Sequence, residues 1–385
     1  MSRHTTIDDH YAPRYVVWEL TLKCDLACRH CGSRAGLPRE QELSLEESFE
    51  LLQQLQELGA REITFIGGEA YLYPHWLEVI ARTSELGIRP TMTTGGRNIT
   101  IQMCRDMKQA GMSGISVSID GLEKTHDHLR AVPKSFQKAI QTLQNCKDVG
   151  IPIFANTQIN RLNIEELSEL GDLFADIGIK EWQVQITGPM GRAADHPEWL
   201  LQPYDMLSLF PNLAHIAEKH HKTFHINLAN NLGYFGPYEY ILRASHWKGC
   251  VAGKFVLGIE SNGDIKGCPS LPSNPYVKGN IRHETLSNIW EQKLDFARDR
   301  GTRELWGFCK GCYYAEICQG GCSWTSHTLL GKRGNMPYCY HRADMLKQKG
   351  ICEILVQRKK ANGEPFDYGC FEIEERPFDS IIKAK

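Results

Sequence analysis

Three cysteines lie within eight positions of one another in the segment KCDLACRHCG, namely Cys24, Cys28 and Cys31. In a chain without an export signal, thiols grouped in this way indicate metal ligation rather than disulfide pairing. A closed structural zinc site takes four ligands, usually as two matched pairs, and no fourth cysteine lies nearby in the sequence. The spacing therefore predicts a metal site that keeps one coordination position open.

A second group of seven cysteines occupies the C-terminal third. Cys250 precedes FVLGIESNGDIKGC, in which two β-rich stretches flank a hairpin-like turn at Asn262 and Gly263 and Cys268 ends the run. The other members are Cys309, Cys312, Cys318, Cys322 and Cys339. Paired CxxC spacing alone would suggest tetrathiolate zinc, but seven thiols do not fill two sites of four ligands each.

Composition describes a globular chain that can bury a large core. The sequence has 385 residues, 42% hydrophobic content and a formal net charge of −2, which favours neither nucleic acid nor a membrane surface as a partner. It contains no apolar signal-peptide core and no run long enough to span a bilayer. A cytoplasmic protein is therefore expected.

Cys104 and Cys146 lie in helical stretches, where buried, inert thiols are the expected interpretation.

Strands and helices alternate in the part of the chain that must hold the first cysteines. The β-rich runs cover residues 14–22, 62–66, 89–94, 114–119, 151–159 and 181–186. Helical stretches separate them, and one begins with a capping box at Ser44 and Glu47 and stops at Gly59. Strand–helix units without hairpin signals predict parallel strands with right-handed crossovers. The expected fold class is α/β, a partial (β/α)6 TIM-type barrel with a C-terminal cysteine-rich domain.

The patterns divide the chain into five parts. They are an N-terminal lead (1–13), the partial barrel (14–215), a bridging segment (216–248), the cysteine-rich domain (249–345) and a C-terminal tail (346–385).

Polar side chains follow several strands at the edge where parallel α/β folds place their chemistry. Gly67, Gly68 and Glu69 follow the second strand, where glycines permit close approach of a ligand and a carboxylate can hold an ammonium group. Ser118 and Asp120 follow the fourth strand and offer a hydroxyl and a carboxylate. The first three cysteines lie at the same edge, so the polar groups are expected to converge on one site.

Together, CxxxCxxC after the first strand, GGE after the second and the Ser/Asp loop after the fourth resemble the radical S-adenosylmethionine (SAM) enzymes. The resemblance implies that the three thiolates hold a [4Fe–4S] cluster whose fourth iron is chelated by SAM. It implies SAM contacts through the GGE residues to the ammonium group, Ser118 near the ribose, Arg130 to the carboxylate, and also Asp120, Asn160 and Gln185. His30 departs from the family pattern, which usually has Tyr or Phe before the last cysteine.

The C-terminal cysteines resemble the SPASM extension of radical SAM enzymes. The resemblance implies one auxiliary [4Fe–4S] cluster held by Cys309, Cys312, Cys318 and Cys339. A second, inner cluster would be held by Cys250, Cys268 and Cys322. Many relatives have a further cysteine where this chain has Val256, so the inner cluster has an open iron or takes a distant ligand such as Cys352 or Cys370. Three [4Fe–4S] clusters are expected in total.

By the same resemblance, an external one-electron reductant of the flavodoxin or ferredoxin type starts cleavage of SAM to a 5′-deoxyadenosyl radical, which removes hydrogen from a substrate. The main hypothesis is maturation of a ribosomally made precursor peptide by crosslinking, epimerisation or backbone excision, as in spliceases. A separate small recognition protein is expected to deliver that peptide. Pro269 after Cys268 counts against sulfatase maturation.

Two other functions remain open on the sequence. One is a radical SAM enzyme acting on a small molecule, such as a haem precursor or a quinone cofactor. The other is a non-catalytic iron–sulfur electron carrier, although a carrier has no need for a cosubstrate loop such as GGE.

Overall fold

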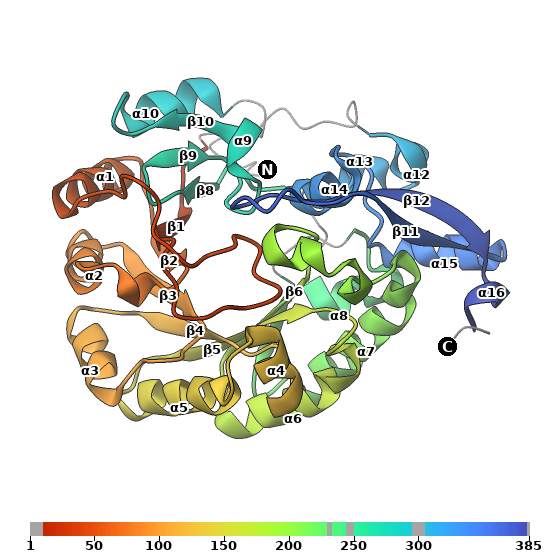
Figure 1. Ribbon diagram of the computed structural model, residues 1–385, viewed down its shortest axis with the longest axis horizontal. Coiled ribbons are helices and arrows are strands. Elements are labelled where there is room, and N and C mark those ends of the chain that lie inside the picture. The colour runs from red at the N-terminus through yellow and green to blue at the C-terminus, as the bar shows by residue number, and fades with distance from the viewer. Residues whose placement is uncertain (1–10, 229–232, 244–249, 295–304, 383–385) are drawn as a thin grey trace, which may run out of the picture.

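The computed structural model describes residues 11–228, 233–243, 250–294 and 305–382. Its main element is a ten-stranded sheet of order β10-β9-β8-β1-β2-β3-β4-β5-β6-β7, in which β1 to β7 run parallel (Figure 1). These strands are β1 Tyr15–Thr21, β2 Glu62–Gly67, β3 Arg89–Thr94, β4 Gly114–Ser118, β5 Ile153–Ile159, β6 Glu181–Ile186 and β7 His225–Leu228. The C-terminal half adds β8 Val256–Ile259, β9 Asp264–Lys266 and β10 Val277–Asn280.

Helices follow the parallel strands and form an arc along the outer side of the sheet (Figure 1). They are α1 Leu45–Glu57, α2 Trp76–Glu85, α3 Ile101–Gln109, α4 Glu123–Arg130, α5 Ser135–Asp148, α6 Leu167–Ile177 and α7 Met206–His220. The predicted capping box starts α1, since the Ser44 hydroxyl accepts from Glu47 N and the Glu47 carboxylate accepts from Ser44 N. Gly59, at φ +82°, then lets the chain turn toward β2.

The two faces of the parallel strands differ in polarity. In β1, Val16, Trp18 and Leu20 are buried with the apolar residues of the helices. Alternate residues point to the inner, concave face of the sheet. There Thr64 Oγ1 lies 3.0 Å from Tyr15 Oη and 2.8 Å from Thr91 Oγ1. The sheet therefore has an apolar outer face and a polar inner face that carries hydroxyls and amides.

The C-terminal half joins the barrel through the sheet itself. Strand β8 pairs parallel with β1, with Tyr15 opposite Val256 and Trp18 opposite Ile259. The predicted hairpin forms between β8 and β9, with Gly263 at φ +89° in the turn. Shorter helices follow: α8 Glu239–Arg243, α9 Ser273–Tyr276, α10 Leu286–Asn288, α12 Gly307–Lys310, α13 Ala315–Cys318 and α14 Ser323–Leu330.

The final segment forms a structured unit of α15 Tyr340–Gln348, β11 Ile351–Lys359, β12 Cys370–Pro377 and α16 Asp379–Ile382. Strands β11 and β12 form a separate antiparallel sheet. Arg342 of α15 makes a buried, two-pronged ion pair with Glu353 of β11, with both contacts at 2.7 Å. The loop before β12 reaches the barrel mouth, where Gly191 N donates to Asp367 O at 2.7 Å.

The predicted fold class is confirmed, and all six predicted barrel strands form. The structure adds a seventh parallel strand, β7, inside the segment that was expected only to bridge the domains. This strand has four residues, HINL, and so has too short an alternating pattern to stand out in the sequence. No helix in the described part of the chain is long and apolar enough to cross a membrane.

Candidate active site

The cysteine loop leaves β1 and returns beside it. Cys24 N donates to Gly36 O at 3.1 Å, and Gly36 N donates to Leu22 O at 3.1 Å, which closes the loop at its base. Burial, together with the charges of Glu69 and the other two thiols, raises the pKa of Cys24 to about 12. Burial likewise raises the pKa of Cys28 to about 11, although Arg130 opposes that rise. The structure thus gathers Cys24, Cys28 and Cys31 into one group whose charges interact.

This thiol group has the chemistry of a metal centre. The raised pKa values of Cys24 and Cys28 keep both thiols protonated at neutral pH, and a metal cluster that binds them displaces the protons and compensates the thiolate charge. Backbone and side chains already offer donors to the sulfurs, with Leu26 N at 3.4 Å from Cys24 Sγ and Ser33 Oγ at 3.5 Å from Cys31 Sγ. The three residues therefore fit a [4Fe–4S] cluster with one iron left for another ligand.

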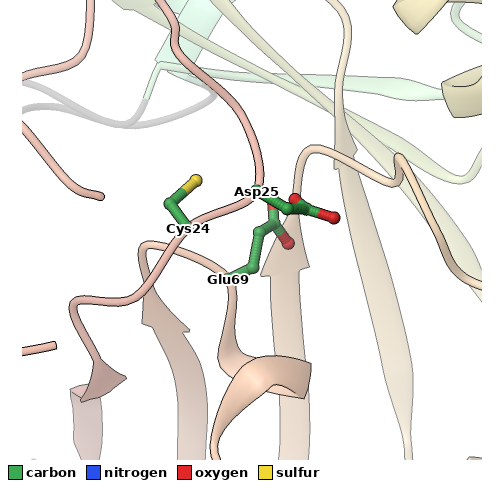
Figure 2. Close-up of side chains that lie close together, drawn as sticks. All are labelled: Cys24, Asp25 and Glu69. Carbon is green, nitrogen blue, oxygen red and sulfur yellow. The ribbon is translucent and has the colours of Figure 1, made fainter. Parts of the chain in front are cut away.

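Two carboxylates lie beside this group (Figure 2). The ligand atoms of Cys24, Asp25 and Glu69 all lie within 4.8 Å of one another. Glu69 is 2% exposed, accepts a short hydrogen bond from the Thr94 hydroxyl and accepts from Gly95 N at 2.6 Å. Burial raises the pKa of Glu69 to about 7, despite these two donors.

Asp25 completes the acidic side of the site. Its Oδ2 accepts from Tyr71 Oη at 2.9 Å and from Asn98 Nδ2 at 2.5 Å. Its Oδ1 is buried and has no hydrogen-bond partner among the described residues. A buried carboxylate oxygen without a partner among the described residues, on a side chain close to Glu69 and Cys24, favours a bound cation, and an ammonium group with three N–H donors fits that requirement.

The two glycines before Glu69 have a structural role that the sequence did not reveal. A methyl group on Gly67 would lie 2.0 Å from Thr21 O, and one on Gly68 would lie 2.2 Å from Lys23 O. Gly68 N donates to Thr21 O, and Glu69 N donates to Lys23 O, both at 2.8 Å. The glycines thus let the ends of β1 and β2 touch, which holds Glu69 against the cysteine loop.

A buried charge cluster lies on the other side of the thiols. Asp120 is fully buried, and its Oδ2 lies 2.5 Å from Arg130 Nη2 and 2.9 Å from His30 Nε2. Burial alone would raise the pKa of Asp120, but the charges of Arg130 and His30 outweigh it and hold that pKa well below its usual range. Arg130 Nη1 also lies 3.5 Å from Cys28 Sγ, while its buried Nε has no partner among the described residues.

The remaining predicted contacts differ in their surroundings. Ser118 ends β4 opposite Asn156 of β5, and Gln185 Nε2 donates to Asn156 Oδ1 at 3.2 Å, so these groups share the inner face. Asn160 is fully buried, and its side chain accepts from Leu162 N at 2.9 Å. The Asn160 Nδ2 lies 3.4 Å from Thr187 Oγ1, so its amide holds the loop after β5.

The outer C-terminal thiols surround one pocket. It is lined by Cys309, Cys312, Cys318 and Cys339 together with aromatic and backbone groups. Met336 N donates to Cys309 Sγ at 3.3 Å, and Tyr234 N donates to Cys339 Sγ at 3.4 Å. Such donors to sulfur are typical of iron–sulfur sites, and the tetrathiolate set fits one cluster.

The inner thiols form a separate group. Burial raises the pKa of Cys268 to about 12, and the neighbouring Cys250 and Cys322 add to that rise. Cys352 lies on β11 with its sulfur 3.4 Å from Arg376 O. Cys370 lies 3.8 Å from the site of a Gly331 methyl group, at the opposite end of α14 from Cys322.

The position of Cys370 relative to Cys322 bears on the fourth ligand of the inner cluster. Gly331 is nine residues after Cys322, which corresponds to about 13 Å along a helix at 1.5 Å per residue. Cys352 and Cys370 both stay predicted alternatives for the fourth ligand of the inner cluster. Cys104 and Cys146 lie on α3 and α5, fully buried, with their sulfurs 3.4 Å apart.

Three residues of the site belong to none of the sequence motifs. Asp25 adjoins Cys24 but is not part of the cysteine pattern, and Thr94 and Gly95 come from the TTGG run at the end of β3. Their position in the chain could have predicted them, because the end of β3 lies at the same edge of the sheet as the ends of β1 and β2.

Comparison with protein families decides the class. Residues 18–188 match the Radical SAM superfamily, and residues 250–313 match SPASM, an iron–sulfur cluster-binding domain. The chain carries a radical SAM domain followed by a SPASM domain. These domains imply [4Fe–4S] clusters and SAM as cofactors, and the matched ranges contain Cys24, Cys28 and Cys31 in the first and Cys250, Cys268, Cys309 and Cys312 in the second.

Solved structures show the same fold. Streptococcus suis SuiB bound to SAM superposes with a TM-score of 0.67 at 19% identity, covering 82% of this chain and 74% of that chain. Native anSMEcpe with bound AdoMet and the Cp18Cys peptide gives a TM-score of 0.67 at 17% identity, covering 86% of this chain and 94% of that chain. At such identities the likeness concerns the fold.

Sequence relatives overturn the expected substrate. A Methanosarcina barkeri protein named AdoMet-dependent heme synthase is 28% identical over 353 residues, covering 86% of this chain and 97% of that protein. A protein named Fe-coproporphyrin III synthase from the same organism is 26% identical over 351 residues, covering 84% of this chain and 87% of that protein. The prediction of a peptide substrate is therefore wrong, and the separate recognition protein loses its basis with it.

Proposed function

We propose that this radical SAM and SPASM protein is an enzyme that acts on a haem precursor. The observation that carries the proposal is the match to an AdoMet-dependent heme synthase along nearly the whole length of both chains. It includes the C-terminal half as well as the barrel, so the likeness extends beyond the motif that all radical SAM enzymes need.

The acidic side of the site suits the amino group of SAM. Carboxylate oxygens of Glu69 and Asp25 lie close to Cys24, and Asp25 Oδ1 has no hydrogen-bond partner among the described residues, so these two side chains would hold the ammonium group of SAM. Arg130, whose Nε has no hydrogen-bond partner among the described residues, would bind the carboxylate of SAM. Ser118 and Gln185 lie on the inner face, where the nucleoside and the substrate would bind. When bound, the cluster and SAM would supply one-electron chemistry, in which SAM is cleaved to a radical that abstracts hydrogen from the substrate.

The protein's own contribution is positioning and exclusion of water. Glu69 is held by Thr94 and Gly95, and the glycine contacts fix it against the cysteine loop. The electron comes from an external reductant of the flavodoxin or ferredoxin type. The thiol groups are assigned to three [4Fe–4S] clusters, of which the inner auxiliary one has three cysteines and one position for another ligand.

Haem precursors are planar macrocycles with carboxylate side chains, and the inner face of the barrel offers partners for such groups. Its amides and hydroxyls include Ser118, Asn156 and Gln185. Hydrogen abstraction from a side-chain carbon requires the carboxylate arm to be held still, which hydrogen bonds from these groups accomplish.

The test is anaerobic incubation of the reconstituted enzyme with SAM, a reductant and Fe-coproporphyrin III. The expected result is formation of 5′-deoxyadenosine that depends on the porphyrin, with a changed porphyrin mass by liquid chromatography and mass spectrometry. SAM cleavage with the porphyrin unchanged and unbound would argue against this substrate. Absence of any 5′-deoxyadenosine would favour the electron-carrier function instead.

A further inference from the structure

Arg130 joins a cluster ligand to a buried carboxylate. The residue ends α4 and is 8% exposed. Its Nη1 donates to Cys28 Sγ at 3.5 Å, while its Nη2 lies 2.5 Å from Asp120 Oδ2. The two nitrogens of one planar guanidinium therefore reach a sulfur and a carboxylate at the same time, a geometry that a lysine cannot reproduce.

Neighbouring contacts prevent the guanidinium from turning away. His30 Nε2 lies 2.9 Å from the same oxygen of Asp120, and His30 Nδ1 lies 3.2 Å from Leu129 O. The second oxygen of Asp120 accepts from Gln158 N at 2.8 Å. Asp120 is thus fixed by a strand and by the cysteine loop, and it fixes Arg130 in turn.

We propose that Arg130 raises the reduction potential of the radical cluster by donating a hydrogen bond to the Cys28 thiolate, with Asp120 and His30 as positioning residues. A donor to a cysteine sulfur withdraws electron density from the iron and favours the reduced state. Because the negative charge of Asp120 offsets the positive charge of Arg130, the directed N–H···S bond is the main effect of Arg130 on the reduction potential of the cluster.

This inference concerns electron entry into the radical cluster and rests on the three-cysteine assignment. It does not depend on a haem precursor, because the potential is measured without any substrate. Failure of the proposed function and failure of this inference are therefore separate results.

The experiment is a redox titration of the holoenzyme, followed by electron paramagnetic resonance without SAM. The radical-cluster signal is defined as the component missing from a variant in which Cys24, Cys28 and Cys31 are all Ala. Arg130→Met should shift that component to more negative potential. Arg29→Met is the matched control, since Arg29 is exposed on the same loop and bonds to His128, and it should shift the potential less.

The double variant Asp120→Asn with Arg130→Met separates the hydrogen bond from net charge. Both charges are then absent, and the potential should stay below that of the wild type because the donor is still missing. A return to the wild-type potential would overturn the proposal and leave charge as the sole cause. A wild-type potential in Arg130→Met alone would overturn it as well.

A spectroscopic measurement covers the case in which Arg130→Met does not hold its cluster. In D2O-exchanged samples, electron–nuclear double resonance of the reduced wild type should show an exchangeable proton coupled to the cluster. Arg130→Lys keeps the charge and should lose that coupling. An unchanged coupling in this variant would show that the proton belongs to another donor. His30→Phe, the aromatic type usual in the family, should weaken the coupling by releasing Asp120.

Discussion

Gly68→Ala tests whether the close contact between the ends of β1 and β2 positions Glu69 beside the thiols. An added methyl carbon would lie 2.2 Å from Lys23 O, 2.5 Å from Lys23 C and 2.6 Å from Leu22 O. Real Cβ atoms hardly ever approach closer than 3.0 Å, and these neighbours are backbone, so one side must move by most of an ångström. Lys23 precedes Cys24 and Gly68 precedes Glu69, so the movement separates Glu69 from the thiols.

The expected loss is large in rate and modest in stability. Overpacking of this kind costs about 1–3 kcal/mol in the free energy of unfolding. Misplacement by about 1 Å can lower a rate about 100-fold, so 5′-deoxyadenosine formation should fall by about that factor. The assay is anaerobic turnover with excess reductant, quantified by chromatography, alongside iron content and thermal unfolding.

Gly36→Ala is the control, because a methyl group there meets nothing within 4 Å and Gly36 lies in the same loop closure. It should keep the wild-type rate. If Gly68→Ala also keeps that rate, the close contact between the two strands does not position Glu69.

Three further predictions follow from the thiols and carboxylates. Replacing Cys24, Cys28 and Cys31 together by Ala should abolish 5′-deoxyadenosine formation and leave iron in the C-terminal domain; unchanged cleavage would contradict the assignment. Anaerobic reconstitution should give about twelve irons per chain from three clusters, and two zinc ions with a single cluster would refute the auxiliary sites. Asp25→Asn should weaken SAM binding about 10- to 100-fold, since a hydrogen bond to a charged group contributes about 1.5–3 kcal/mol. Equilibrium binding measures it, with Asp195→Asn, at an exposed side chain, as the control.

Much of the fold followed from local patterns. The capping box at Ser44 and Glu47, the six β-rich runs and the Asn262-Gly263 turn are contiguous in sequence, and each appears in the structure. Strand β7 escaped because four residues carry little periodicity. Its place depends on pairing with β6, which only the assembled sheet specifies.

The site was predictable where its residues are neighbours in the chain. The cysteine spacing predicted the thiols, and the GGE run predicted Glu69. The contact between Arg130 and Cys28 joins residues 102 positions apart, so no local pattern indicates it. Asn160 stays a predicted ligand contact, and the structure adds that its amide also holds the loop after β5. The substrate was missed because peptide and haem-precursor enzymes share these motifs, and only relatives matching along the whole chain distinguish them.

The pairing of β1 with β8 has a consequence for synthesis of the protein on the ribosome. Val256, the partner of Tyr15, leaves the ribosome only after 241 further residues have been added. At about 5–20 residues per second, β1 keeps an unpaired edge for roughly 12 to 48 s. Its unpaired backbone groups lie on a strand with the apolar side chains Val16, Trp18 and Leu20, and such an exposed edge favours pairing with strands of other chains. Nascent chains of this protein should therefore depend on chaperones until the C-terminal half emerges.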